Sequence, residues 1–253
     1  MDGWMAERER RLAEFFGTGA EGREWAAPEA SKFELPPEAS KGLAHFNIEW
    51  HIIPTEEAVP FDGAYAARLY PSAPKDFLEP HEHGASYRER FTEGHRRLQG
   101  RVVGVETTRK PRYLPGNRQF YGTAYGHDPS ADPYAPYMGR AGMMNGTRYA
   151  HNYLSLRTLL QVVNEDWRAR SILPAGYRVT VCPPVVFNLV GTLFHPEWSE
   201  SETLELGFYR DAAGNATCYA VGSNAPGDFS YVNEVEGEAE WSLTGFRLAL
   251  IPE

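Results

Sequence analysis

The sequence has little cysteine and lacks the common cofactor and nucleophile motifs. Only two of its 253 residues are cysteines, Cys182 and Cys218, which is too few for a disulfide framework. Because both lie in apolar, strand-like sequence, we expect buried free thiols rather than a bridge or a nucleophile. The chain contains no GxGxxG, GxxxxGK(S/T), CxxC, HExxH or GxSxG motif. Nucleotide-dependent, zinc-protease and hydrolase functions therefore lose their usual support.

Long apolar runs and excess positive charge are also missing. No apolar run approaches the roughly 20 residues that span a bilayer. The first residues, DGWMAERERRLAEFF, are charged from the start and lack the apolar core of a signal peptide. The net charge of −9 and a pI near 5.4 argue against nucleic acid or an anionic membrane as the main partner. We therefore expect a cytoplasmic protein.

Hydrophobic periodicity predicts two clear helices. Residues 4–16 place Leu12, Phe15 and Phe16 on one apolar face, and residues 153–171 carry leucines and a valine at helical spacing. A third helix is expected over residues 86–100, which Gly100 would end. Residues 17–42 form a Gly/Ala/Pro/Ser-rich arm, and residues 111–150 a long Gly/Pro/Tyr/Asn-rich loop. A loop of that length is usually functional, so we expect it to cover a site.

The remaining sequence predicts mostly β-strands. The expected strands are 44–53, 101–110, 177–182, 185–195, 202–211, 215–223 and 240–251, with a hairpin signal at AAGN between Asp211 and Ala216. The sum is a single α+β catalytic domain over residues 1–253. We expect a mainly antiparallel sheet, flat or curled, with helices packed on one side.

Histidines offer a first candidate chemistry. His81 and His83 form an HxH pair, and His95 could complete a metal site, since two imidazoles two residues apart on a strand share a side. No second strand supplies a partner histidine, so loop histidines without a metal are the favoured interpretation. A metal-dependent lyase or oxygenase using these histidines stays as an alternative.

A second candidate lies in the long loop, where HDPSAD contains His127, Asp128 and Asp132. A histidine next to an aspartate suggests a base. Asp-Pro and Asp/Ser clusters are, however, common turn chemistry, so a loop role is favoured here.

The third candidate is a charged triplet, Arg68, His83 and Glu93, set among Tyr65, Tyr70, Tyr87 and Phe91. Each residue also has a simpler explanation, because Glu93 is one of several charges on a predicted solvated helix. The spacings of fifteen and ten residues resemble the Arg…His…Glu pattern of the bacterial McbB-type Pictet–Spengler enzymes, which build β-carbolines. The position of the triplet in the first third of the chain agrees with that pattern.

The resemblance implies a cofactor-independent condensation of L-tryptophan with a small aldehyde or keto-acid. It implies a (tetrahydro-)β-carboline product and a homodimer. Glu93 would be the principal acid/base, His83 would share proton transfer, and Arg68 would hold a carboxylate. A non-catalytic small-molecule-binding barrel is the main alternative from another class, since 14 Tyr, 13 Phe and 6 Trp would also suit a binder.

Overall fold

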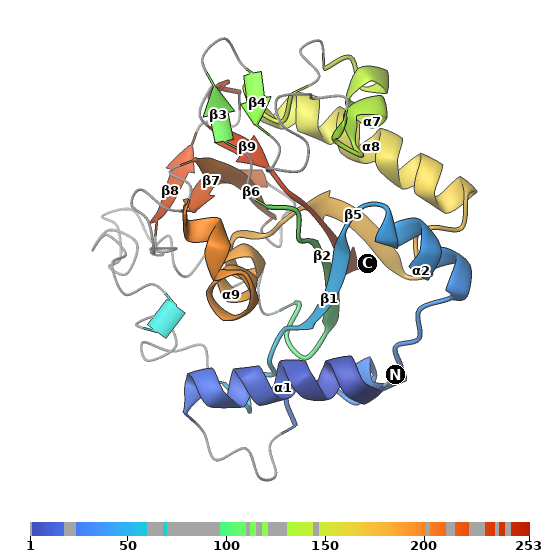
Figure 1. The fold of residues 1–253 in the computed structure, drawn as a ribbon, viewed down its shortest axis with the longest axis vertical. Coiled ribbons are helices and arrows are strands. Elements are labelled where there is room, and N and C mark those ends of the chain that lie inside the picture. The colour runs from blue at the N-terminus through green and yellow to red at the C-terminus, as the bar shows by residue number, and fades with distance from the viewer. Residues whose placement is uncertain are drawn as a thin grey trace.

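The structure of the chain is a computed structural model. It describes residues 2–17, 24–59, 68–69, 97–109, 112–114, 118–120, 131–143, 147–200, 203–210, 216–222, 231–235, 238–240 and 244–253. Helices and antiparallel-dominated sheets confirm the α+β class (Figure 1). Within those ranges, no helix combines the length and apolarity needed to cross a membrane.

An antiparallel sheet of four strands lies between two hydrophobic cores. Its order is β1 (Ile48–Ile52), β2 (Val102–Glu106), β10 (Leu248–Pro252) and β5 (Tyr177–Val181). Successive side chains of a strand point to opposite faces. Accordingly, Ala249 and Ile251 of β10 enter one core, while Leu248 and Leu250 enter the other.

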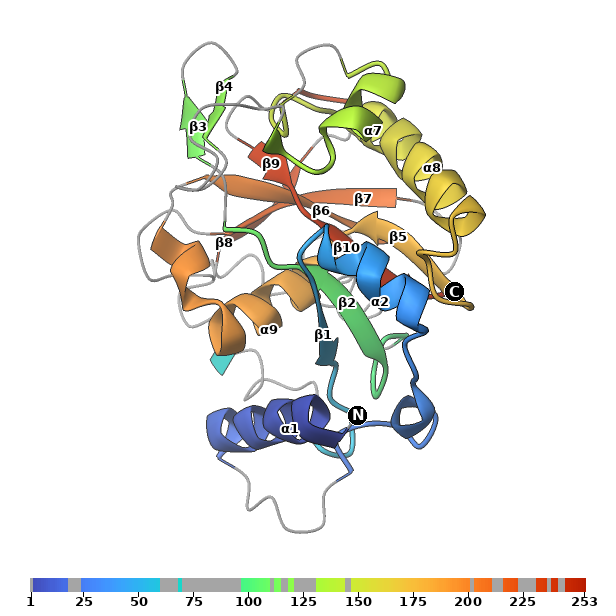
Figure 2. The ribbon, with the colours of Figure 1, turned by 45° about the vertical axis from the view of Figure 1, so that its right-hand side comes forward.

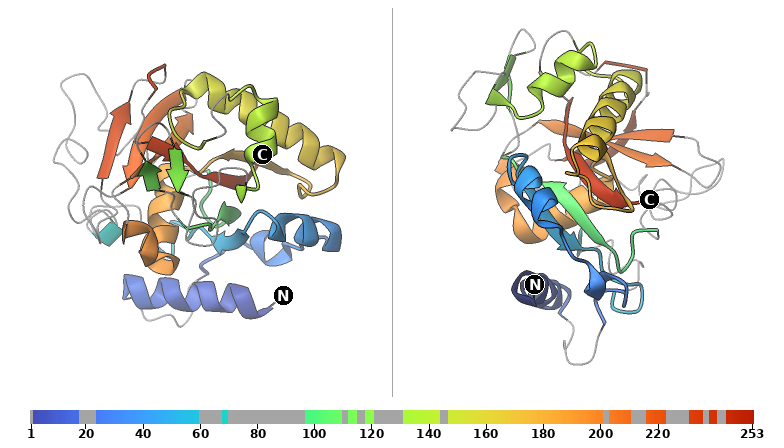
Figure 3. Two further views of the ribbon diagram at one scale, coloured as in Figure 1. Left: turned by 45° about the horizontal axis from the view of Figure 1, so that its top comes forward. Right: turned by 90° about the vertical axis from the view of Figure 1, so that its right-hand side faces the viewer.

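Helices cover both faces of this sheet. The first core receives α1 (Asp2–Phe16) and α9 (Pro184–Phe194). The second receives α2 (Pro37–Ala44), α7 (Ala135–Arg140) and α8 (Tyr153–Ala169). Figures 2 and 3 show α1 and α8 on opposite sides of the strands. The sequence indicated helices on one side, but β10 is buried on both faces and so needs cover on both.

Two further sheets complete the described part. One has the order β8 (Tyr231–Val235), β7 (Ala216–Gly222), β6 (Leu204–Arg210) and β9 (Thr244–Phe246), and only the β6–β9 pairing is parallel. The other pairs β3 (Arg112–Leu114) with β4 (Arg118–Phe120). Short 3-10 helices lie at η1 (Ala30–Lys32) and η3 (Pro196–Glu200). None of these described sheets closes into a barrel.

The clearest helix prediction is confirmed in α8. The Asn152 side chain caps its first turn by accepting a hydrogen bond from the Ser155 amide at 3.0 Å. The predicted helix over 4–16 is confirmed in α1. The antiparallel β6–β7 pairing agrees with the predicted hairpin, whose turn lies outside the described residues.

The prediction of a strand over 185–195 is wrong, because this segment is helix α9. Nine of its eleven residues are buried, so it shows no amphipathic period and looks like a buried strand in sequence. Pro184 at its first position is the helix-start signal, since a proline there loses no intrahelical hydrogen bond.

Other boundaries also change. The arm contains α2, and β1 begins only at Ile48. The long loop contains β3, β4 and α7. The segment 240–251 holds two strands, β9 and β10, which belong to different sheets and meet at Arg247. Of the predicted helix 86–100, residues 86–96 lie outside the described part, and Arg97–Gly100 form a turn.

Both cysteines are buried and neither forms a disulfide, as expected. Cys182 is 2% exposed, and burial raises the pKa of its thiol far above the ordinary value. A thiol kept in its neutral form is a poor nucleophile, so its place in the core is a packing role.

Candidate functional site

Arg68 is the one member of the predicted triplet among the described residues. His83 and Glu93 lie outside them, as do His81, His95, His127 and Asp128. The guanidinium of Arg68 is exposed and donates a hydrogen bond to the carbonyl of Phe15 in the last turn of α1. A guanidinium presents five N–H donors in a planar fork, which is a geometry that matches a carboxylate.

One described end of the segment that holds the triplet contacts α9, and the other lines a groove that α9 also lines. At one end, the Leu69 carbonyl accepts a hydrogen bond of 2.9 Å from the Nδ2 atom of Asn188, in the middle of α9. At the other end, Arg97 and Leu98 line a groove together with Pro184, at the first turn of α9. One helical turn separates Pro184 from Asn188.

The groove beside α9 has a volume of about 810 Å³ and is rich in arginine. Five of its twenty lining residues are arginines, and only two are acidic. The five are Arg97, Arg101, Arg157, Arg168 and Arg178. Arg168 is paired with Glu253, the C-terminal residue, which lines the groove as well. In a chain of net charge −9, this concentration of guanidinium groups favours an anionic ligand.

Aromatic and apolar side chains share the groove with the arginines. The rings of Tyr153 and Phe208 both line it and meet edge to face, with centroids 5.0 Å apart. Leu160 and Val185 add apolar surface. A site that combines cationic groups with aromatic and apolar surface suits a flat aromatic molecule that carries a carboxylate.

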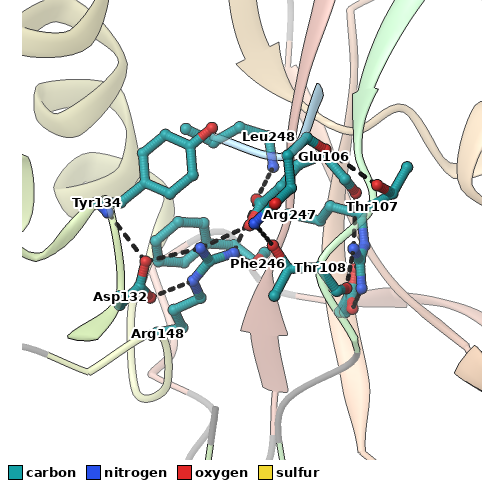
Figure 4. Close-up of polar contacts among 11 residues, drawn as sticks. Glu106, Thr107, Thr108, Asp132, Tyr134, Arg148, Phe246, Arg247 and Leu248 are labelled. Atoms are coloured by element: carbon teal, nitrogen blue, oxygen red, sulfur yellow. Dashed lines mark hydrogen bonds and ion pairs between the residues drawn. The ribbon is translucent and has the colours of Figure 1, made fainter. Parts of the chain in front are cut away.

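A buried charge network lies next to the central sheet, at the end of β2 (Figure 4). Arg148 is 1% exposed, and its guanidinium donates hydrogen bonds to two carboxylates. Its Nε and Nη2 atoms reach Asp132 at 2.5 and 2.8 Å, and its Nη1 and Nη2 atoms reach Glu106 at 2.8 and 2.7 Å. Bidentate ion pairs of this kind fix the relative orientation of the side chains and also add electrostatic attraction.

Arg247, between β9 and β10, forms a second buried pair. Its Nε and Nη2 atoms donate to Glu205 at 2.9 and 2.8 Å, and its Nη1 donates to the carbonyls of Glu106 and Thr108 at 2.7 Å. Its guanidinium lies 3.8 Å from the ring centre of Trp198. Burial disfavours the charged form, yet the Glu205 carboxylate outweighs burial and raises the pKa of Arg247. The network links the two larger sheets. We call it the frame, and its residues are Glu106, Asp132, Arg148, Glu205 and Arg247.

Asp132 belongs to this frame, whereas His127 and Asp128 of the same predicted turn lie outside the described residues. Asp132 is 1% exposed, and its Oδ1 accepts a hydrogen bond of 2.9 Å from the Tyr134 amide just before α7. The frame itself was not predicted. The sequence feature that could have indicated the frame is a charged residue within an apolar run, as at Glu106 in RVVGVE and Arg247 in LTGFRLALI.

No protein-family model, curated protein or solved structure matches this chain. The McbB-type resemblance therefore stays a prediction from three spaced residues.

Proposed function

We propose that the protein catalyses a Pictet–Spengler condensation of L-tryptophan with a small aldehyde or keto-acid, giving a (tetrahydro-)β-carboline. The observation that carries the proposal is an arginine-rich, aromatic groove lined by Arg97 and Leu98, at one described end of the Arg68–Arg97 segment, together with the first turn of α9. The spacing of Arg68, His83 and Glu93 supplies the reaction class. The proposal includes a cytoplasmic homodimer and no cofactor.

The reaction needs proton transfers and electrostatic stabilisation. The tryptophan amine attacks the carbonyl carbon, and loss of water gives an iminium ion. Carbon 2 of the indole then forms the new carbon–carbon bond, and its proton leaves to restore aromaticity. Glu93 takes that proton, and its carboxylate stabilises the cationic iminium. His83 gives a proton to the departing carbonyl oxygen, since imidazole changes charge near neutral pH.

The groove suits the substrate side of this reaction. L-Tryptophan carries a carboxylate and a flat indole, and a keto-acid adds a second carboxylate. Arg97 and Arg157 offer planar forks for these anions, beside the rings of Tyr153 and Phe208. Arg97 follows Glu93 by four positions in the chain, so the acid/base and the groove are close in sequence.

Incubation of the purified chain with L-tryptophan and a panel of aldehydes and keto-acids tests the proposal. We expect a fluorescent product with the mass of the two substrates less one water. Glu93→Gln should lower kcat by about 10²–10⁴-fold while tryptophan binding survives, because a lost acid/base slows chemistry and not binding. Glu57→Gln, at an exposed position, is the matched control. Tryptophan binding without product from any partner would favour the non-catalytic binder instead.

A second variant tests the groove. Arg157→Gln should raise KM for the acid substrates by about 10–150-fold with little change in kcat, because a charge-assisted hydrogen bond contributes about 1.5–3 kcal/mol. Arg170→Gln is the control, since Arg170 is exposed at the end of the same helix and does not line the groove. Equal KM values in the two variants would remove the groove from the proposal.

A further inference from the structure

A cluster of two histidines and a glutamate lies where β1 meets the end of α9. Glu49 and His51 are two residues apart on β1, so they share one face of the strand. His195 follows the last residue of α9. One ligand atom from each of the three residues lies within 4.8 Å of the others. The Oε2 atom of Glu49 is 3.4 Å from Nε2 of His195 and 3.9 Å from Nε2 of His51.

These separations match those of ligands around one ion. Metal bonds to imidazole nitrogen or carboxylate oxygen are near 2.1 Å, which places tetrahedral ligand atoms about 3.4 Å apart. The two measured separations from Glu49 are close to that value. Small side-chain rotations would bring all three atoms to one centre.

His195 is oriented as a metal ligand usually is. Its Nδ1 lies 2.8 Å from the Oε1 atom of Glu197, and the Trp198 ring stacks on its imidazole with centroids 4.8 Å apart. A histidine ligand commonly donates its second N–H to a carboxylate, which fixes the tautomer. With the proton on Nδ1, the lone pair of Nε2 faces the Glu49 carboxylate, and a cation between these two acceptors would satisfy both.

His51 supplies an independent observation. Its side chain is fully buried, and neither ring nitrogen has a hydrogen-bond partner within the described ranges. A buried polar group without a partner is unfavourable, so such a group calls for a ligand. The neutral form of an imidazole is the form that binds a metal.

The charges around the cluster leave a net preference for a cation. Glu49 and Glu197 carry two negative charges, and Arg8 of α1 balances one of them through its Nη2 contact of 2.9 Å with Glu49 Oε2. A carboxylate can bind Arg8 and a metal together, because its two oxygens offer about four lone-pair sites. The Glu49 side chain is 41% exposed, so the cluster has an open side toward solvent.

We propose that Glu49, His51 and His195 bind one divalent transition-metal ion of the zinc class, with Glu197 orienting His195. Two imidazoles favour such an ion over magnesium or calcium, which prefer oxygen ligands. The ion would link β1 to the end of α9, and its remaining position would face the open side. This site is distinct from the HxH pair at His81 and His83, and it does not rest on the Pictet–Spengler proposal.

Zinc titration of the tag-free full chain, after removal of metals with a chelator, tests the site. Calorimetry should show one zinc ion per chain, and cobalt should give the visible absorption of a low-coordinate site. Both signals should disappear in His195→Gln and Glu49→Gln and persist in His45→Gln, an exposed histidine next to α2. Glu197→Gln should weaken zinc binding about 10–100-fold, as loss of an orienting carboxylate does.

Two outcomes would overturn the proposal: no stoichiometric binding by the parent chain, or equal affinity in the parent chain and Glu49→Gln. Circular dichroism checks that each variant folds. If His195→Gln does not fold, Glu49→Gln decides alone, because this isosteric change falls on a partly exposed side chain. Zinc should also raise the melting temperature of the parent chain and leave that of Glu49→Gln unchanged.

Discussion

Arg148 shows how a single buried side chain can hold three segments of the chain together. Its guanidinium meets Asp132 before α7 and Glu106 at the end of β2, and it also lies 5.0 Å from the Tyr134 ring centre. Removing one partner of a buried ion pair leaves the other charges buried without compensation. The frame is therefore more sensitive at Arg148 than a surface ion pair would be.

Arg148→Met should lower the free energy of unfolding by about 3–5 kcal/mol, because it strands Asp132 and Glu106 in the core. Arg140→Met is the matched control, since Arg140 is about half exposed and pairs with Asp166 at 3.1 Å. Exposed pairs contribute about 0–1 kcal/mol. Urea unfolding measures both variants, and equal losses would show that Arg148 has no special structural role.

The burial of His151 predicts that the free energy of unfolding depends on pH. Burial lowers its pKa below the ordinary 6.5, although the Thr147 carbonyl, 2.6 Å from its Nε2, partly opposes that shift. The unfolded chain then binds more protons at this residue than the folded chain. Its stabilising contribution is thus present above pH 6.5 and is lost as the pH falls from there toward the lower folded pKa.

His151→Gln should reduce the loss of unfolding free energy between about pH 7.5 and about pH 5.5. Urea unfolding at both pH values measures the difference between variant and parent chain. His45→Gln, at an exposed histidine, should keep the parent slope. An unchanged slope in His151→Gln would mean that His151 does not titrate differently in the folded state.

Helix α9 adjoins both candidate sites, and it is the element whose type was predicted wrongly from the sequence. It packs against β6 and β7, contacts α1, and adjoins both the groove and the proposed metal cluster. Its apolar residues face all directions, so only Pro184 distinguished it from a buried strand. Helix α8 was predictable because one face is buried and the other is polar.

The contact between α9 and β6 requires a glycine. A Cβ atom on Gly207 of β6 would lie 2.6 Å from Cγ of Pro184, closer than packed atoms allow. Gly207→Ala should therefore cost about 1–3 kcal/mol of unfolding free energy. Gly139→Ala in α7 is the opposite case, since nothing lies within 4 Å of the added methyl group.

Gly139→Ala should leave stability unchanged or raise it by about 0.5–1 kcal/mol, because alanine is the better helix former. Thermal melting of the two variants compares them directly. A loss in Gly139→Ala as large as that in Gly207→Ala would contradict the packing argument.

At the scale of the whole molecule, local sequence patterns predicted the class of fold but not the frame or the cluster of Glu49, His51 and His195. Strand alternation and helical periodicity were enough for the α+β class and its antiparallel sheets. Glu49 and His195 are 146 positions apart, and Arg148 and Glu106 are 42 apart. No local pattern joins such pairs, so only the folded chain brings them together. The spacing of Arg68, His83 and Glu93 is a local pattern, so the reaction class predicted from it does not depend on contacts between distant segments.

The most direct test of the proposed function uses L-tryptophan deuterated on its indole ring. The purified chain, a carbonyl partner and this substrate should give a product that has lost one water and the carbon-2 deuterium, because a new carbon–carbon bond forms at that carbon. Mass spectrometry reads both changes at once, and Glu93→Gln should lower the rate by about 10²–10⁴-fold. A product that retains the carbon-2 deuterium, or no product with any carbonyl partner, would contradict the account.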